Sequence, residues 1–290
     1  MKNIILLSVF CVFLTSCLER RGPAVWVIKD TDTEMYITGT VHALPKKTSW
    51  YYSDIEALIA SSRGVFFEVD ETAPENQKID RYLRKYGLLN GTRNLKELLP
   101  EHLYKDLRSG LVRFSQLSST IDQMKPWHAA FIYEARKYFI QHKYKMDHTL
   151  DTLALETVRK YSVPIISLET IEAQLQVLDG LSDEQEVIYV KSVLDGDVNS
   201  LSNTEQSIEA WRLGNVDEQK RLLETYTRSY PSLAENLLYQ RNKNWADRLA
   251  LQMVERDGAY VVIVGVAHLV GDNSLLDLLR NQGFDVQRVY

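Results

Sequence analysis

Two histidines follow a glycine at the same spacing near the two ends of this 290-residue chain. His42 comes three residues after Gly39, and His268 comes three residues after Gly265. A run of β-branched and aromatic residues precedes each glycine, which predicts a buried strand. Glycine permits a sharp change of chain direction, so we expect each imidazole at the carboxyl end of a strand. Ligands bind at that edge of open α/β sheets.

A carboxylate is placed in a similar way. Glu68 directly follows the apolar residues 65–67, where a carboxyl group costs stability unless it has a partner. Imidazole binds metals or transfers protons near neutral pH, and two histidines with a carboxylate form a typical metal site. We therefore predict a divalent metal held by His42, Glu68 and His268. The alternatives are hydrogen-bonded structural histidines and a Glu68 that ends its strand at the surface.

Arg241 and Asn242 lie within residues 231–255, whose apolar spacing predicts a helix. A guanidinium there could neutralise Glu68 or stabilise an oxyanion, and the amide of Asn242 could contact substrate or orient a histidine. We predict catalytic roles for Glu68, Arg241 and Asn242. For Arg241 a structural salt bridge is an equally good interpretation.

Two further carboxylates are weaker candidates. Glu169 ends a predicted strand, as Glu68 does, and either faces the same cleft or caps the next helix. Asp151 is either a catalytic acid or the N-cap of a helix. The sequence contains no nucleotide-binding loop, no Gly-x-Ser-x-Gly elbow and no His-Glu-x-x-His motif.

Strands near both ends of the chain enclose a helical middle. The predicted strands are residues 24–29, 35–40, 64–69, 164–168, 258–264 and 285–289. Polar residues 30–33 join the first two in a hairpin. Strands alternating with helices indicate an α/β fold, with a mixed central sheet flanked by helices. Helical spacing over residues 76–146 and 172–236 predicts a large helical insertion, a cap over one edge of the sheet.

The beginning of the chain has the three parts of a bacterial lipoprotein signal peptide. Lys2 is the positive region, residues 4–14 are apolar, and the segment from Leu14 to Cys17 matches the lipoprotein cleavage pattern. A transmembrane helix needs about 20 apolar residues, so this stretch is too short to be one. We predict a signal peptide at 1–16, a tether at 17–23 that begins with lipidated Cys17, and one domain at 24–290. The alternative is a plain secreted protein with a chance cysteine.

Export restricts the partners of the mature protein. Several acyl chains on Cys17 give stable membrane anchoring, and the absence of Asp after it favours the outer membrane, facing the periplasm of the cell envelope. Cys11 is removed with the signal, so His and carboxylate side chains must hold any metal. The formal net charge of −5 argues against nucleic acid as the main partner.

Five segments, in order, resemble the TraB/GumN family. They are Gly39 to His42 with Phe67 and Glu68, then Asp151, residues 164–170 with Gln174, residues 241–245, and residues 265–271. The resemblance covers about residues 26–289. It departs from the family at Val266 and Ala267, where alanine and glycine are usual.

The family is similar to the Tiki membrane metalloproteases, which use paired Gly-x-x-His motifs and a divalent metal, and distantly similar to erythromycin esterases and haem-binding ChaN-like proteins. The resemblance implies metal-dependent, peptidase-like hydrolysis by water activated among His42, Glu68 and His268, with manganese, cobalt or zinc as the metal. Two alternatives stay open. One is a module that binds a small ligand, haem or a peptide without turnover, and the other is a protein that blocks a peptide signal.

Overall fold

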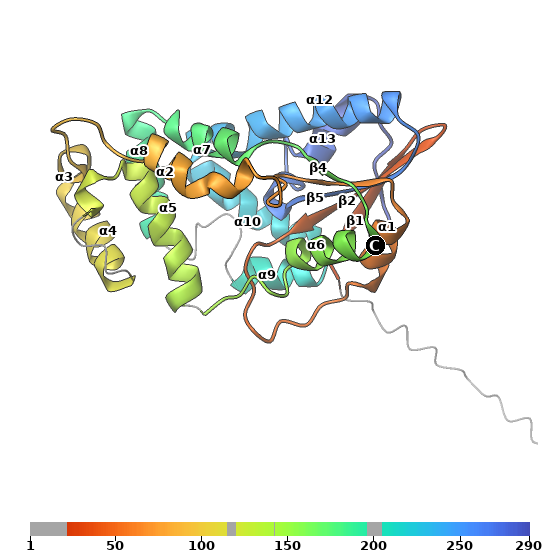
Figure 1. Ribbon diagram of the computed structural model, residues 1–290, viewed down its shortest axis with the longest axis horizontal. Coiled ribbons are helices and arrows are strands. Elements are labelled where there is room, and N and C mark those ends of the chain that lie inside the picture. Colours follow the sequence, from red (N-terminus) through yellow and green to blue (C-terminus); the bar gives the residue numbers. More distant parts are fainter. Residues whose placement is uncertain (1–21, 115–119, 142, 196–204) are drawn as a thin grey trace, which may run out of the picture.

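A mixed six-stranded sheet forms the centre of the protein (Figure 1). The computed structural model describes residues 22–114, 120–141, 143–195 and 205–290. The strands are β1 (Val25–Lys29), β2 (Thr33–Thr40), β3 (Gly64–Phe67), β4 (Ile165–Ser167), β5 (Gly258–Gly265) and β6 (Gln287–Arg288). Their order is β4-β3-β5-β2-β1-β6. Strands β2, β5, β3 and β4 pair in parallel, and β1 pairs antiparallel with β2 and β6, which confirms the predicted α/β class.

The hairpin at the start of the domain is confirmed, with β1 and β2 paired antiparallel over the whole of β1. The last predicted strand is too long: only Gln287–Arg288 is β-structure, because only Trp26 and Val27 of β1 pair with it. Strand β3 also ends two residues earlier than predicted, at Phe67, which places Glu68 just past the strand end.

Helices cover both faces of the sheet. The helices of this layer are α1 (Ser53–Ser61), α6 (Leu150–Tyr161), α9 (Glu205–Arg212), α12 (Gln240–Glu255) and α13 (Leu275–Asn281). On one face, Phe67 packs with side chains of α1, α6 and α9. On the other face, Phe66 packs with side chains of α12 and α13. Burial on both faces explains why the central strands are continuous apolar runs.

A second helical layer forms the cap. Its helices are α2 (Ile79–Tyr86), α3 (Leu95–Leu98), α4 (Glu101–Phe114), α5 (Pro126–Arg136), α7 (Ile171–Asp179), α8 (Asp183–Leu194), α10 (Val216–Ser229) and α11 (Pro231–Ala234). They share a separate apolar core, centred on residues such as Leu107, Trp127 and Tyr226. Figure 1 shows α3, α4, α5 and α8 together beyond the end of the sheet. A helical insertion is therefore confirmed, while the limits 76–146 and 172–236 stay predictions.

Residues 1–21 lie outside the described part of the chain, and with them the signal peptide, Cys17 and most of the predicted tether. Among the helices that are described, none combines the length and the apolar character that crossing a bilayer requires.

Candidate functional site

The parallel pairing of the sheet brings the two Gly-x-x-His motifs together. In the register of β2 and β5, Gly39 pairs with Val264 and Thr40 with Gly265, so both motifs leave the sheet at one edge. A Cβ atom on Gly39 would lie 2.9 Å from the Cα of Val266, which explains the need for glycine at this crossing. Strand β3 lies on the other side of β5 and ends at the same edge. Glu68 therefore emerges beside both histidines.

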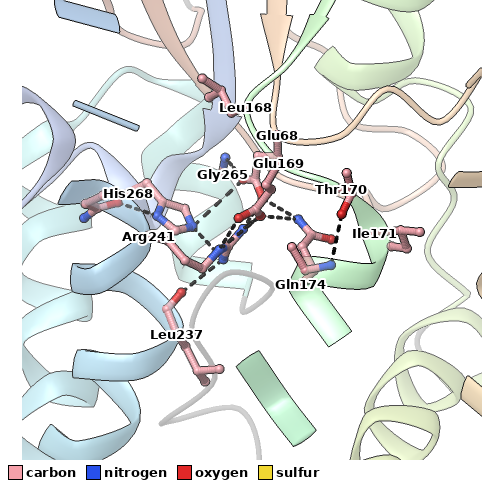
Figure 2. Close-up of polar contacts among 12 residues, drawn as sticks. Glu68, Leu168, Glu169, Thr170, Ile171, Gln174, Leu237, Arg241, Gly265 and His268 are labelled. Atoms are coloured by element: carbon pink, nitrogen blue, oxygen red, sulfur yellow. Dashed lines mark hydrogen bonds and ion pairs between the residues drawn. The ribbon is translucent and has the colours of Figure 1, made fainter. Parts of the chain in front are cut away.

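Glu68 is the centre of a hydrogen-bond network (Figure 2). Its Oε1 accepts a hydrogen bond from the backbone N–H of Gly265 at 2.7 Å. Its Oε2 accepts from Nη2 of Arg241 at 2.7 Å and from Nε2 of Gln174 at 3.2 Å. Burial alone would raise the pKa of Glu68, but the Arg241 guanidinium, together with smaller contributions from the two histidines and the Gly265 N–H, outweighs burial and holds the pKa at about 2. The carboxyl group is thus ionised at any physiological pH.

Arg241 joins Glu68 to the other carboxylate of this edge. Its Nη2 donates to Oε1 of Glu169 at 2.5 Å, and its Cζ atom lies over Trp245 at 4.7 Å from the ring centroid. Another nitrogen of the guanidinium, Nη1, donates a hydrogen bond to the carbonyl oxygen of Leu237 at 3.0 Å. The side chain is 16% exposed, so this is a largely buried pair of salt bridges. Of the interpretations left open for Arg241, the structure shows the salt bridge, with both glutamates.

A π-helical turn, η5 (Glu235–Tyr239), leads directly into α12 and carries Leu237. The sequence predicted one continuous helix over residues 231–255. The structure instead has α11, this π turn and α12 in succession. A π turn holds one more residue than an α turn and often lies at functional sites. Here it provides the carbonyl oxygen that orients Arg241.

His268 is buried as the neutral imidazole. Its Nδ1 donates to Oδ1 of Asn242 at 2.6 Å, and Asn242 Nδ2 donates in turn to the carbonyl oxygen of Asn273 at 2.8 Å. Nε2 accepts from Nη1 of Arg241 at 3.2 Å, which fixes the tautomer because a guanidinium can only donate. Burial, and then the charge of Arg241, lowers the pKa of His268 to about 3. The lone pair of Nε2 is therefore directed at Arg241, while Oε1 of Glu68 lies 4.0 Å from the same nitrogen.

His42 is held from the opposite side by Asp151. The distance from Nδ1 of His42 to Oδ2 of Asp151 is 3.3 Å, and Thr40 donates a hydrogen bond from Oγ1 to the same oxygen at 2.6 Å. The side chain of His42 is 53% exposed, and the Asp151 carboxylate raises its pKa to about 9. The N-cap interpretation of Asp151 is wrong, because Thr149 caps α6. Asp151 instead orients an imidazole.

The three predicted metal ligands all approach Gly265. A Cβ atom on Gly265 would lie 3.2 Å from Oε1 of Glu68, 3.5 Å from Cδ2 of His268 and 3.7 Å from Nε2 of His42. Each imidazole also has its Nδ1 beside an oxygen, the outer support that metal-binding histidines usually have. The donor set therefore fits a divalent ion. Within the described residues, however, no group of three or more His, Cys, Asp or Glu side chains has metal-binding geometry as it stands, and the Arg241 guanidinium already binds both Glu68 and His268.

These side chains line a cavity of about 320 Å³ between the sheet edge and the cap, which we call the cap pocket. Its polar end is formed by His42, Glu68, Gln174, Arg241, Gly265 and His268. The helices of the cap provide most of the apolar wall, from Phe131, Leu175, Val177, Leu178, Tyr189, Val193 and Tyr226. Of the predicted catalytic residues, Glu68 and Arg241 line the pocket, whereas Asn242 lies behind His268. The pocket is also lined by Glu134. This residue was not predicted, because no sequence pattern distinguishes it from other glutamates in helical segments.

A family model for the TraB/PrgY/gumN family matches residues 24–288. The chain belongs to this family. It is 25% identical to "Metalloprotease TIKI2" of Danio rerio over 87% of its own length and 58% of that protein. It is 24% identical to "Metalloprotease TIKI1" of Homo sapiens, over 97% of the chain and 68% of that protein. "Uncharacterized protein YbaP" of Escherichia coli (strain K12) is 27% identical, over 63% of the chain and 69% of that protein.

The chain thus spans between 58% and 68% of the length of the Tiki relatives it matches first. No solved structure matches it significantly. The family resemblance inferred from the five sequence segments is confirmed.

Proposed function

We propose that this protein is a metal-dependent hydrolase of peptides, with its reaction centre at the polar end of the cap pocket. The observation that carries the proposal is the convergence of His42, Glu68 and His268 around Gly265, at the polar end of the cap pocket. Relatives named metalloproteases support this class of activity. The identity of the metal, manganese, cobalt or zinc, is also part of the proposal.

In this mechanism each residue has a defined task. Nε2 of neutral His268, Nε2 of His42 and Oε1 of Glu68 would hold the ion, which lowers the pKa of a bound water and makes it a nucleophile. His42 has to lose a proton before it can bind a metal, because Asp151 favours its charged form. With a pKa of about 2, Glu68 is a ligand rather than a proton acceptor.

Two further side chains act on charge and orientation. Arg241 is a buried cation beside both Glu68 and His268, so its N–H groups can stabilise the negative charge that develops on a carbonyl oxygen under attack. The amide oxygen of Asn242 accepts a hydrogen bond from Nδ1–H of His268. This keeps the proton on Nδ1 and the lone pair on Nε2, which faces the pocket.

The paired state of Arg241 favours a second candidate, a pocket that binds a peptide or small ligand without turnover. In the described structure the guanidinium forms an ion pair with both Glu68 and Glu169, so each carboxylate has a cationic partner without a bound ion. Such a module would use the pocket and the cation but would not cleave its ligand.

Calorimetric titration of the purified protein with Mn²⁺, Co²⁺ and Zn²⁺ tests the metal. Binding should occur in the wild type and disappear in His42→Ala and His268→Ala, while His102→Ala, which removes an exposed imidazole of α4, should bind as the wild type does. A peptide library read by mass spectrometry tests hydrolysis. Metal-stimulated cleavage that is absent in Glu68→Ala supports the enzyme; metal binding without cleavage of any peptide leaves the binding module.

We further propose that the chain is exported as a lipoprotein of the bacterial outer membrane, anchored through Cys17 and facing the periplasm. The support is the sequence pattern of residues 1–17 alone. Labelling with radioactive palmitate should mark the wild type and not Cys17→Ser, and the variant should leave the membrane fraction. A wild type that takes up no label contradicts the anchor.

A further inference from the structure

The cap side of the pocket carries one carboxyl group. Glu134 lies near the end of α5, and apart from Glu68 at the polar end it is the only acidic residue among the described residues that line the cavity. Around it the wall is apolar and aromatic, with Phe131 on the same helix and Tyr189 and Tyr226 from α8 and α10. A carboxylate in such surroundings is costly unless a partner balances it.

Among the residues that the structure describes, no hydrogen bond or ion pair reaches the Glu134 carboxyl group. Burial raises its pKa to about 7, and the charge of Lys137, one turn further along, opposes the shift only in part. Glu186 of α8 offers a comparison, because burial raises its pKa to about 7 as well. Glu186, however, is hydrogen-bonded to the backbone of Trp127 and does not line the cap pocket.

The groups that face Glu134 favour a cation. Burial, and then the negative charge of Glu134, raises the pKa of the Tyr189 and Tyr226 hydroxyls, so both remain neutral phenols. Aromatic rings attract cations over their faces, and Tyr189, Tyr226 and Phe131 all line the cavity. A carboxylate among aromatic rings, with no hydrogen-bonded or ion-paired partner among the described residues, has the composition of a binding site for an ammonium or guanidinium group.

We propose that Glu134 is a specificity residue, which binds a positively charged nitrogen of the ligand at the cap end of the pocket. The ligand class is then a peptide that combines apolar side chains with a cationic group, either a free amino terminus or a basic side chain. This inference rests on the proposed function in that the pocket holds a peptide. The apolar wall binds the carbon chains of the ligand, while Glu134 sets the direction in which it enters relative to Glu68 and Arg241.

A pair of small probes tests the cation site without any need for catalysis. We expect 2-phenylethylammonium to bind the wild type at pH 8 at least about tenfold more tightly than 2-phenylethanol, the gain typical of a hydrogen bond to a charged group. Glu134→Gln should remove this preference and leave the affinity for the alcohol unchanged. The matched control, Glu186→Gln, removes a carboxyl with the same shifted pKa outside the pocket and should leave both affinities unchanged. Equal binding of the two probes by the wild type, or an unchanged preference in Glu134→Gln, would overturn the proposal.

Three versions of one apolar peptide identify the source of the charge: a free amino terminus, an acetylated terminus, and an acetylated terminus with one added lysine. Binding of the first but not the second assigns Glu134 to the amino terminus, and recovery in the third assigns it to a basic side chain. Equal cleavage of all three, unaffected by Glu134→Gln, refutes the cation site but leaves hydrolysis standing. Charge-selective binding without cleavage refutes hydrolysis but leaves the cation site standing.

Discussion

Replacing Arg241 with methionine would remove the one cation shared by Glu68 and Glu169. The guanidinium lies 2.7 Å from Glu68 and 2.5 Å from Glu169, whose side chains are 15% and 12% exposed. Methionine keeps an unbranched apolar chain against Trp245, so the loss is mainly one of charge. Breaking a buried ion pair by removing one partner costs about 3–5 kcal/mol. For a protein of this size each kcal/mol lowers Tm by about 2–4 °C, so we expect Tm to fall by about 6–20 °C.

The pH dependence of this loss distinguishes charge from packing. The pKa of Glu68 in the folded wild type is about 2, below the ordinary 4.5, so its ionised form stabilises the fold above pH 4.5 and that contribution is lost as pH falls toward 2. In Arg241→Met the pKa of Glu68 should rise, because burial then acts without the opposing cation. The difference in unfolding free energy between wild type and variant should therefore be largest at pH 7 and smaller at pH 4.

Thermal unfolding followed by circular dichroism at both pH values measures the effect. Arg221→Met is the control, because Arg221 forms an exposed pair with Glu218 on α10, and such pairs contribute about 0–1 kcal/mol. A Tm for Arg241→Met within about 2 °C of the wild type would show that the Arg241 ion pairs do not stabilise the fold, and an equal loss at pH 4 and pH 7 would show that the loss does not come from the charge of Glu68. Added Mn²⁺ should raise the Tm of the variant more than that of the wild type, because the ion then binds Glu68 without competition from the guanidinium.

Three other substitutions give separate tests. Gly265→Ala places a methyl group 3.2 Å from Glu68 Oε1 on a backbone that alanine can adopt, so metal affinity should fall in calorimetry while Tm changes little. Asn242→Leu removes the acceptor for His268 Nδ1 and should weaken metal binding about 10–100-fold, the usual effect of losing an outer support. Burial raises the pKa of Glu186 to about 7, so the wild type loses stability as pH rises from 4.5 to 7. Urea unfolding should show a smaller loss over that range in Glu186→Gln.

The strand ends were predictable because their signal is local. A buried apolar run followed by glycine or by a charged residue marks where a strand stops, and this pattern alone predicts that His42, Glu68 and His268 lie at strand ends. That these ends belong to three adjacent parallel strands, β2, β5 and β3, depends on pairing between distant segments. No local pattern contains that information.

The partners of the charged side chains were less predictable. Arg241 pairs with Glu169 across 72 residues and with Glu68 across 173, and a π turn sets its position. Helical periodicity cannot reveal such a turn, since one extra residue leaves the apolar pattern almost unchanged. Glu134 could not be predicted from the sequence either. What distinguishes it is that it lines the pocket without a hydrogen-bonded or ion-paired partner among the described residues, and this depends on how the helices of the cap pack.

The contacts of Arg241 explain how the residues of the proposed hydrolytic centre can be stable in the folded protein without a metal. Two carboxylates and a neutral imidazole at one strand edge need a cation, and a chain that relied on metal alone would leave Glu68 and Glu169 unbalanced whenever the ion was absent. Arg241 removes that dependence, since its guanidinium binds all three groups. In the proposed hydrolase, an ion that bound Glu68 and His268 would compete with Arg241 for both groups. The N–H groups that Arg241 now directs to Glu68 and His268 would then become donors at the polar end of the pocket, where a carbonyl oxygen under attack would need them.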